Sequence, residues 1–204
     1  MKNINTIIFD LGGVLIDWNP EYVYLDVFHN NREKMKWFFD NICTSDWNEN
    51  QDAGYPLSKA TEERVALFPE HEELIRMYYG RWEDMLGEAI HETVAILKQL
   101  IDTKKYKIVA LTNWSHETFP IALERFEFLQ WFDGILVSGE EKTRKPFPKI
   151  YELTLNRFDI QAENALFIDD NLRNIEAAKV MGIHTIHFIS SAGLKKSLKD
   201  LNIL

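Results

Sequence analysis

Residues 6–18 carry the sequence TIIFDLGGVLIDW, which starts with strand character and turns polar at Asp10. Residues 6–9 run straight into Asp10, and an apolar run bounded by turn residues is typical of a strand buried on both faces in a parallel sheet. Asp10 would then stand at the carboxyl end of the strand, where open α/β sheets bind ligands. Gly12 and Gly13 allow the backbone to approach a ligand closely. This stretch therefore predicts a carboxylate at a ligand crevice, the alternative being an aspartate that only begins a turn.

The chain has 204 residues, of which 46% are hydrophobic and 27% are charged. This length fits one globular domain, or one domain that carries an insertion, and the apolar content supplies a sizeable core. The net charge of −9 argues against general binding to nucleic acids or anionic membranes, because both need a basic surface. An anionic substrate is compatible with this charge, since a metal ion or one lysine can reverse the local field.

The cysteine content and the apolar segments bear on the compartment. The single cysteine, Cys43, allows no internal disulfide, fits a reducing compartment and is expected to serve only in packing. The N-terminal region lacks the basic and apolar stretches of a secretory signal, and no segment approaches the ~20 apolar residues of a membrane span. We therefore expect a soluble, cytoplasmic protein with no nucleic-acid and no membrane partner.

Residues 20–90 show helical patterns and no convincing strand. Helices are predicted over residues 31–42, 58–68 and 72–80. Asn31 is a candidate N-cap for the first of these helices, and the aromatic residues Trp37 and Phe38 within it are expected to lie in the core. This part of the chain is therefore predicted to be a small helical module.

From His91 onward, helical and strand patterns alternate. Strands are predicted over residues 107–111, 134–138, 165–168 and 184–189. Helices are predicted over residues 115–126, 148–158 and 172–181, with a polar loop over residues 139–146. This alternation predicts an α/β fold with a doubly wound, Rossmann-like parallel sheet. Since the strand at residues 6–9 fits the same sheet, we expect a core of residues 1–17 and 91–204, with a helical cap of residues 18–90 inserted after the first strand.

Three of the predicted strands end in polar residues. These residues are Asp10, Thr112 with Asn113, and Asp169 with Asp170. The carboxyl ends of parallel strands share one edge of a sheet, so these groups are expected to converge there, close to Lys145 from a neighbouring loop. Carboxylate oxygens of this kind suit Mg²⁺, which usually binds one or two carboxylates together with a substrate phosphate. The plainer alternatives are an acidic turn at 169–170, a solvated loop lysine at 145 and a helix-capping role for Thr112.

These residues occur in four short motifs whose order and spacing resemble those of the haloacid dehalogenase superfamily. The motifs are residues 10–14 (DLGGV), 111–113 (LTN), 144–146 (RKP) and 167–171 (FIDDN). The resemblance covers nearly the whole chain, weakly in the insert, and is to the branch with a helical cap after the first strand. It implies a hydrolase with a Rossmann-like core.

By this resemblance, Asp10 is the nucleophile that attacks phosphorus and forms an aspartyl-phosphate. The resemblance also implies a Mg²⁺ ion held by the Asp10 carboxylate, the Gly12 backbone carbonyl and one acidic residue of the pair at 169–170. We expect Asp170 to make the direct contact. Asp169 would act on the ion partly through water. The function we expect first is therefore that of a Mg²⁺-dependent phosphatase acting on a small phosphorylated metabolite, with a sugar phosphate as one candidate.

The remaining site residues implied by the resemblance surround the phosphate. Thr112 would donate a hydrogen bond to a phosphoryl oxygen, helped by the Asn113 amide, and Lys145 would neutralise charge between the nucleophile and the phosphate. Further substrate contacts are expected from Gly12, Gly13, Trp18 and Trp47.

One position departs from the family pattern, because Gly12 stands where most of its phosphatases carry a second aspartate as general acid and base. Such help is typically worth about 10²–10⁴ in rate, so its loss favours good leaving groups, such as a sugar 1-phosphate or an acyl phosphate, or a substitute residue. Candidate substitutes are Asp17, His116 and Asp52. A branch with this glycine resembles sugar-phosphate phosphatases.

Two other functions fit the same motifs. A metal-independent 2-haloacid dehalogenase would use the aspartate to attack carbon, but it has no need for the acidic pair at 169–170. A catalytically weak binding or regulatory protein would keep the fold after losing the acid at position 12. The substrate depends on the cap, whose loops carry little transferable signal.

Overall fold

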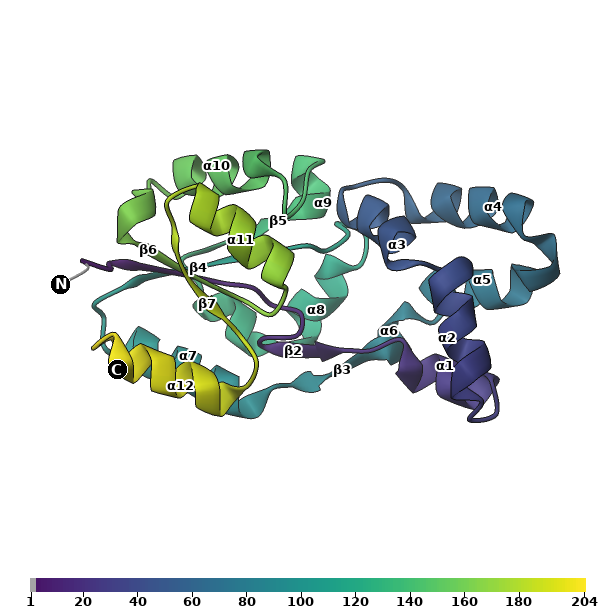
Figure 1. Cartoon of the computed structure of the whole chain (residues 1–204), viewed down its shortest axis with the longest axis horizontal. Helices are drawn as coiled ribbons and strands as arrows, with labels where there is room; N and C mark the ends of the chain where they lie inside the picture. The colour runs from purple at the N-terminus through teal and green to yellow at the C-terminus, as the bar shows by residue number, and fades with distance from the viewer. Residues whose placement is uncertain (1–2) are drawn as a thin grey trace.

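The computed structural model describes residues 3–204 and shows a parallel sheet at the centre of the larger lobe (Figure 1). Within these residues the sheet has five strands in the order β5-β4-β1-β6-β7. The strands are β1 (Thr6–Phe9), β4 (Lys107–Thr112), β5 (Gly134–Val137), β6 (Ala165–Asp169) and β7 (His184–His187). All neighbouring pairs are parallel. The predicted doubly wound α/β fold is therefore confirmed.

Helices cover both faces of this sheet because its strands are apolar on both sides. Ile7 and Phe9 of β1 pack into one hydrophobic cluster, whereas Ile8 between them packs into the other. The first cluster lies under helices α7 (His91–Asp102), α8 (Phe119–Arg125) and α12 (Ser191–Asp200). The second lies under α10 (Pro148–Arg157) and α11 (Leu172–Val180). Successive residues of β1 thus point to opposite faces of the sheet, and both faces are buried under helices.

The segment between β1 and α7 forms a separate helical lobe, on the right of Figure 1. Its helices are α1 (Glu21–Val27), α2 (Arg32–Asn41), α3 (Ser45–Asp52), α4 (Leu57–Leu67), α5 (Glu72–Gly80) and α6 (Trp82–Met85), with the 3₁₀ turn η1 (Pro69–His71). The lobe has its own hydrophobic cluster, in which Tyr24, Phe38 and Ile75 are fully or almost fully buried. The free thiol of Cys43 is buried in this cluster.

The predicted cap of α2 is confirmed, since the Asn31 side chain accepts a hydrogen bond from the Lys34 backbone N–H at 3.0 Å. The expectation for Trp37 is wrong, because its side chain is 50% exposed while Phe38 is 1% exposed. Met35 and Phe38 lie three residues apart and share the inward face of the helix. Trp37 lies about 100° around the helix axis from Phe38 and about 160° from Met35, and so points to solvent.

A two-stranded antiparallel ribbon joins the two lobes. It pairs β2 (Ile16–Trp18) with β3 (Leu86–Ala89), and Figure 1 shows it running between them. The expectation that residues 20–90 contain no strand is therefore wrong for the last few residues of that segment, which form β3. The sequence of β3, LGEA, is poor in β-branched and aromatic residues, and its strand state depends on pairing with a segment about 70 residues away.

The two largest differences from the predicted boundaries in the larger lobe are at residues 115–118 and 138–141. The helix expected over 115–126 begins at Phe119, because the preceding residues form a turn in which the Thr118 and Phe119 amides bond to the Ser115 carbonyl. The loop expected over 139–146 starts with a short helix, α9 (Ser138–Glu141). Among the described residues, no helix has both the length and the apolar content that a membrane crossing requires.

Candidate active site

Polar residues from β1, β4 and β6 meet at one edge of the sheet. Asp10 follows β1 directly, and Thr112 and Asp169 are the last residues of β4 and β6. β1 lies between the other two strands, with Phe9 in register with Ala110 on one side and Ile168 on the other. The three strand ends therefore lie side by side, and their polar groups share one small volume.

Three carboxylates gather at this edge, from Asp10, Asp169 and Asp170, each offering an oxygen within 4.8 Å of the others. Asp10 and Asp169 are buried, and Asp170 is exposed. Hard oxygen donors at this spacing fit Mg²⁺, and two buried carboxylates beside a third need positive charge nearby. The donor set is therefore suited to a divalent cation.

Lys145 supplies part of that positive charge. Its Nζ lies 2.8 Å from Asp10 Oδ2 and 2.7 Å from Asp169 Oδ2, and the residue is 1% exposed. Burial by itself would lower the pKa of Lys145, but the two carboxylates hold that pKa above its usual value. Lys145 is therefore a buried counter-ion, and the alternative of a solvated loop lysine is wrong.

The side chain of Asn113 holds Lys145 in place. Its Nδ2 donates to the Lys145 carbonyl at 3.0 Å, and its Oδ1 accepts from the Lys145 backbone N–H at 2.8 Å. Both polar ends of the Asn113 side chain are thus engaged with the loop. This geometry gives the Asn113 side chain a positioning role.

The two members of the acidic pair have different surroundings. Asp169 is fully buried, and its oxygens accept hydrogen bonds from the Asn171 backbone and the Asn174 side chain in addition to Lys145. The Asp170 carboxylate faces Gly13, since a Cβ built on Gly13 would lie 2.4 Å from Asp170 Oδ2. The Asp169 oxygens are thus occupied by hydrogen bonds within the protein, whereas the Asp170 carboxylate is exposed and faces the loop that follows β1.

Asp10 is buried, and its Oδ1 accepts a hydrogen bond from the Leu11 backbone N–H at 2.7 Å. Its pKa is raised, first by burial and then by the negative charge of Asp169, and Lys145 works against this rise. Thr112 is 1% exposed, and its hydroxyl has no hydrogen-bond partner within residues 3–204. A buried hydroxyl of this kind can bond to a ligand at the strand ends.

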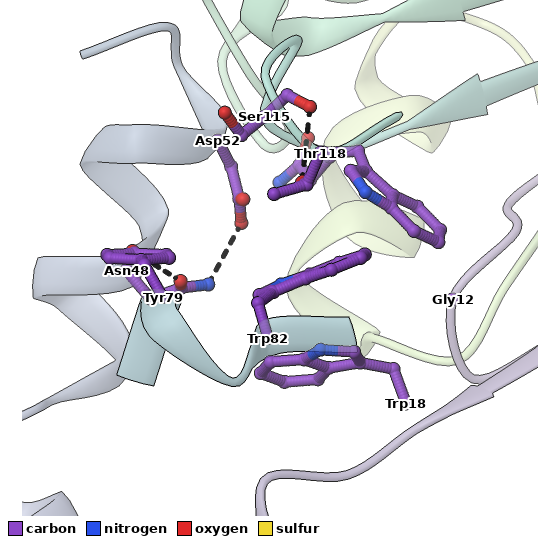
Figure 2. A pocket seen from close by; sticks show the side chains of 10 residues that line it. Gly12, Trp18, Asn48, Asp52, Tyr79, Trp82, Ser115 and Thr118 are labelled. Carbon is purple, nitrogen blue, oxygen red and sulfur yellow. Dashed lines mark hydrogen bonds between the residues drawn. The ribbon is translucent and has the colours of Figure 1, made fainter. Parts of the chain in front are cut away.

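A pocket of about 100 Å³ lies between this edge and the helical lobe (Figure 2). Its lining residues are Gly12, Trp18, Asn48, Asp52, Tyr79, Trp82, Asn113, Trp114, Ser115 and Thr118. The indole nitrogens of Trp18 and Trp114 are buried without a hydrogen-bond partner in the described part of the chain. The pocket therefore has aromatic walls, and Asn48, Asp52 and Ser115 add polar side chains to its lining.

Four of the expected substrate contacts, Gly13, Trp47, Thr112 and Lys145, do not line this pocket. Thr112 and Lys145 lie beside Asp10 at the edge of the sheet. Trp47 packs its ring against Tyr78 and Tyr79, at centroid distances of 5.2 and 5.3 Å, and lines a different surface cavity. Gly13 turns toward Asp170 instead. Trp18 and Gly12 both line the pocket.

Residues 7–188 match the model of the family described as haloacid dehalogenase-like hydrolase. The chain belongs to the haloacid dehalogenase-like hydrolase family. It is 25% identical over 201 residues to a phosphorylated carbohydrates phosphatase of Thermotoga maritima, covering 97% of this chain and 88% of that one. It is 26% identical over 205 residues to a sesquiterpene phosphatase of Aspergillus oryzae, covering 95% and 94%. The magnesium-bound HAD-hydrolase YfnB of Bacillus subtilis shares the fold, with a TM-score of 0.72, 18% identity and coverage of 98% and 100%.

Several pocket residues of this haloacid dehalogenase-like hydrolase escaped the sequence analysis. They are Asn48, Tyr79, Trp82, Trp114, Ser115 and Thr118. Trp114 directly follows the motif at residues 111–113, so its position along the chain was a usable signal. The residues from the helical lobe had no such signal, because their approach to the site depends on how the two lobes pack.

Gly13→Ala is expected to lower the free energy of unfolding of this hydrolase by about 1–2 kcal/mol and to weaken Mg²⁺ binding. Gly13 has φ of +72°, which disfavours a side chain, and the new methyl would meet Asp170 Oδ2 at 2.4 Å. Urea unfolding and a Mg²⁺ titration by calorimetry measure the two effects. The control is Gly80→Ala, where a Cβ meets nothing within 4 Å. Equal stability of the two variants would contradict the prediction.

Proposed function

We propose that this haloacid dehalogenase-like hydrolase is a Mg²⁺-dependent phosphatase that acts on a small phosphorylated metabolite. The observation that carries the proposal is the group of three carboxylates beside the buried Lys145 and the unpartnered Thr112 hydroxyl. The relatives from Thermotoga maritima and Aspergillus oryzae are named as phosphatases, and the Bacillus subtilis structure holds magnesium. The proposed compartment is the cytoplasm, on the basis of the single cysteine.

Asp10 is the proposed nucleophile. One of its carboxylate oxygens attacks phosphorus and displaces the leaving oxygen, and water later hydrolyses the aspartyl-phosphate. Lys145 neutralises charge between Asp10 and the incoming phosphoryl group, to which the Thr112 hydroxyl donates a hydrogen bond. Asp10 and Thr112 are placed by strand ends, and Lys145 is placed by a loop that is bound to the Asn113 side chain. This arrangement suits a reaction that depends mainly on positioning and charge.

The proposed metal ligands are the carboxylates of Asp10 and Asp170 and the backbone carbonyl of Gly12. Asp170 is favoured over Asp169 for direct contact, because the Asp169 oxygens already accept bonds from Lys145 and Asn174. Bound Mg²⁺ would neutralise charge on the phosphoryl oxygens and orient them.

The helical lobe is the proposed substrate-selecting cap, with residues 18–90 inserted into a core of residues 1–17 and 91–204. Three tryptophans, Trp18, Trp82 and Trp114, line the pocket beside polar groups. Aromatic faces together with hydrogen-bonding groups suit a small leaving group that carries hydroxyls, such as the sugar of a sugar phosphate.

Phosphate release from a panel of phosphorylated metabolites is expected to require Mg²⁺ and to stop when EDTA is added. Mg²⁺ at about 100 times its Kd is also expected to raise the free energy of unfolding by about 2.7 kcal/mol, because it binds the folded chain. Colorimetric phosphate assays and urea unfolding measure the two effects. The control is release of halide from 2-haloacids in EDTA. Halide release that survives chelation, without phosphate release, would replace the phosphatase proposal with a dehalogenase.

A further inference from the structure

Cleavage of a phosphate ester needs a proton for the leaving oxygen, and the groups around Asp10 do not offer one. Lys145 is committed to two carboxylates, and Asp169 is fully buried and fully bonded. Position 12, two residues after Asp10, is a glycine without any titratable side chain. The inference below rests on the proposed phosphatase function and concerns which residue supplies this proton.

Of the three titratable side chains considered from the sequence, only Asp52 lines the pocket. His116 is exposed. Asp17 is bonded to the Tyr22 hydroxyl and packs beside Gly87 at the ribbon. Asp52 is the last residue of α3 and lines the same pocket as Gly12 and Asn113. In the chain, Asn113 directly follows Thr112, and Gly12 comes two residues after the nucleophile Asp10.

A chain of hydrogen bonds orients the Asp52 carboxyl. Gln51 donates to the Tyr79 hydroxyl at 3.0 Å, and that hydroxyl donates to Asn48 Oδ1 at 2.8 Å. Asn48 Nδ2 then donates to Asp52 Oδ2 at 3.3 Å, as the dashed line in Figure 2 shows. One oxygen of Asp52 is thus fixed by Asn48, and the other is left for a ligand in the pocket.

Helix α3 is anchored to the larger lobe beside this carboxyl. The Asp52 carbonyl accepts a hydrogen bond from Ser138 Oγ at 2.5 Å. Glu49, one turn earlier, pairs with Arg144 at 2.7 Å and with Arg173 at 2.5 Å. These contacts hold Asp52 over the same loop that carries Lys145.

The surroundings of Asp52 raise its pKa to about 7, first through burial and then through the negative charge of Glu49. Arg144 and Lys145 work in the opposite direction. The hydroxyls of Tyr78 and Tyr79 are the other titratable groups that face it. A carboxyl with this pKa holds a proton at neutral pH and can also release it.

We propose that Asp52 is the general acid and base of the reaction, in the role that the glycine at position 12 cannot fill. In the first step Asp10 bonds to phosphorus, the bond to the leaving oxygen breaks, and the Asp52 proton passes to that oxygen. In the second step the Asp52 carboxylate takes a proton from water as the water oxygen bonds to phosphorus and the Asp10–phosphorus bond breaks. Inorganic phosphate is released, and both aspartates return to their starting states.

The test compares Asp52→Asn with the wild type on phenyl phosphate and p-nitrophenyl phosphate in the presence of Mg²⁺. Nitrophenolate leaves without a proton, whereas phenolate depends on one. We expect the variant to lose about 10²-fold in kcat/KM on phenyl phosphate and less than about 10-fold in kcat/KM on p-nitrophenyl phosphate. The ratio kcat/KM reports the first step, in which the two leaving groups differ, whereas hydrolysis of the aspartyl-phosphate is common to both esters. For the wild type, kcat/KM on phenyl phosphate should fall as the pH rises through about 7, because the Asp52 acid loses its proton, and this fall should vanish in the variant.

The matched control is Asp46→Asn, an exposed carboxylate in the first turn of the same helix, which should leave both rates unchanged. Equal losses in kcat/KM of Asp52→Asn on both esters, or no loss on either, would overturn the role of Asp52 and leave the phosphatase proposal standing. No phosphate release by the wild type from either ester would overturn the phosphatase proposal and the inference together. If Asp52→Asn unfolds at the same temperature as the wild type, a loss of activity is due to catalysis and not to misfolding.

Discussion

Asp10→Asn is expected to lower Mg²⁺-dependent phosphate release by at least about 10³-fold. The amide oxygen of asparagine is neutral and a far weaker nucleophile than a carboxylate, and removal of a covalent catalyst leaves only binding and charge stabilisation. Steady-state assays on the best substrate of the panel measure the loss. Because asparagine has nearly the same shape and its Oδ1 can still accept the Leu11 N–H, the fold should persist.

A measurement of the free energy of unfolding distinguishes a loss of catalysis in Asp10→Asn from a loss of the folded state. In Asp10→Asn, Lys145 keeps Asp169 as a carboxylate partner, so the free energy of unfolding should fall by less than it does in Lys145→Met, where both carboxylates lose their cation. The matched control is Asp102→Asn at the exposed end of α7, which should keep full activity. Activity above about a tenth of wild type in Asp10→Asn would contradict the assignment of the nucleophile.

Lys145→Met is expected to lower the free energy of unfolding by about 3–5 kcal/mol without metal and to remove most activity. The substitution leaves the buried carboxylates of Asp10 and Asp169 without their cation, and the loss of one partner from a buried ion pair has this magnitude. Urea unfolding in EDTA measures the stability, and phosphate release in Mg²⁺ measures the activity.

Added Mg²⁺ gives this prediction a second readout. A divalent cation at the carboxylates would replace part of the missing charge, so Mg²⁺ should stabilise Lys145→Met more than it stabilises the wild type. Lys149→Met, at an exposed position of α10, is the control and should change neither stability nor activity by much. Equal stability of the two variants in EDTA would show that the ion pair at Lys145 contributes little.

The parallel sheet was predictable because each of its strands is marked by its own residues. The apolar runs at β1, β4 and β6 are bounded by polar residues, and parallel strands bring those residues to one edge whatever lies between them. The proximity of Asp10 and Asp169, about 160 residues apart in the chain, thus follows from local patterns and one topological rule.

The pocket and the ribbon could not be predicted in the same way. β3 is a strand only because it pairs with β2, and Trp47 turns toward Tyr78 and Tyr79 only because of the way α3 packs on α5. Asp52 was one of three candidates from the sequence, and nothing in its neighbours along the chain separated it from Asp17 or His116.

The amino-acid sequence alone specified the sheet and the strand-end carboxylates, because local polarity and strand topology determine both. It also shows directly that position 12 is a glycine. The tertiary structure decided that Lys145 is buried between two carboxylates and that Asp52 lines the pocket. These features depend on contacts between segments far apart in the chain. Such contacts are set by packing and desolvation, which leave no periodic pattern in the sequence.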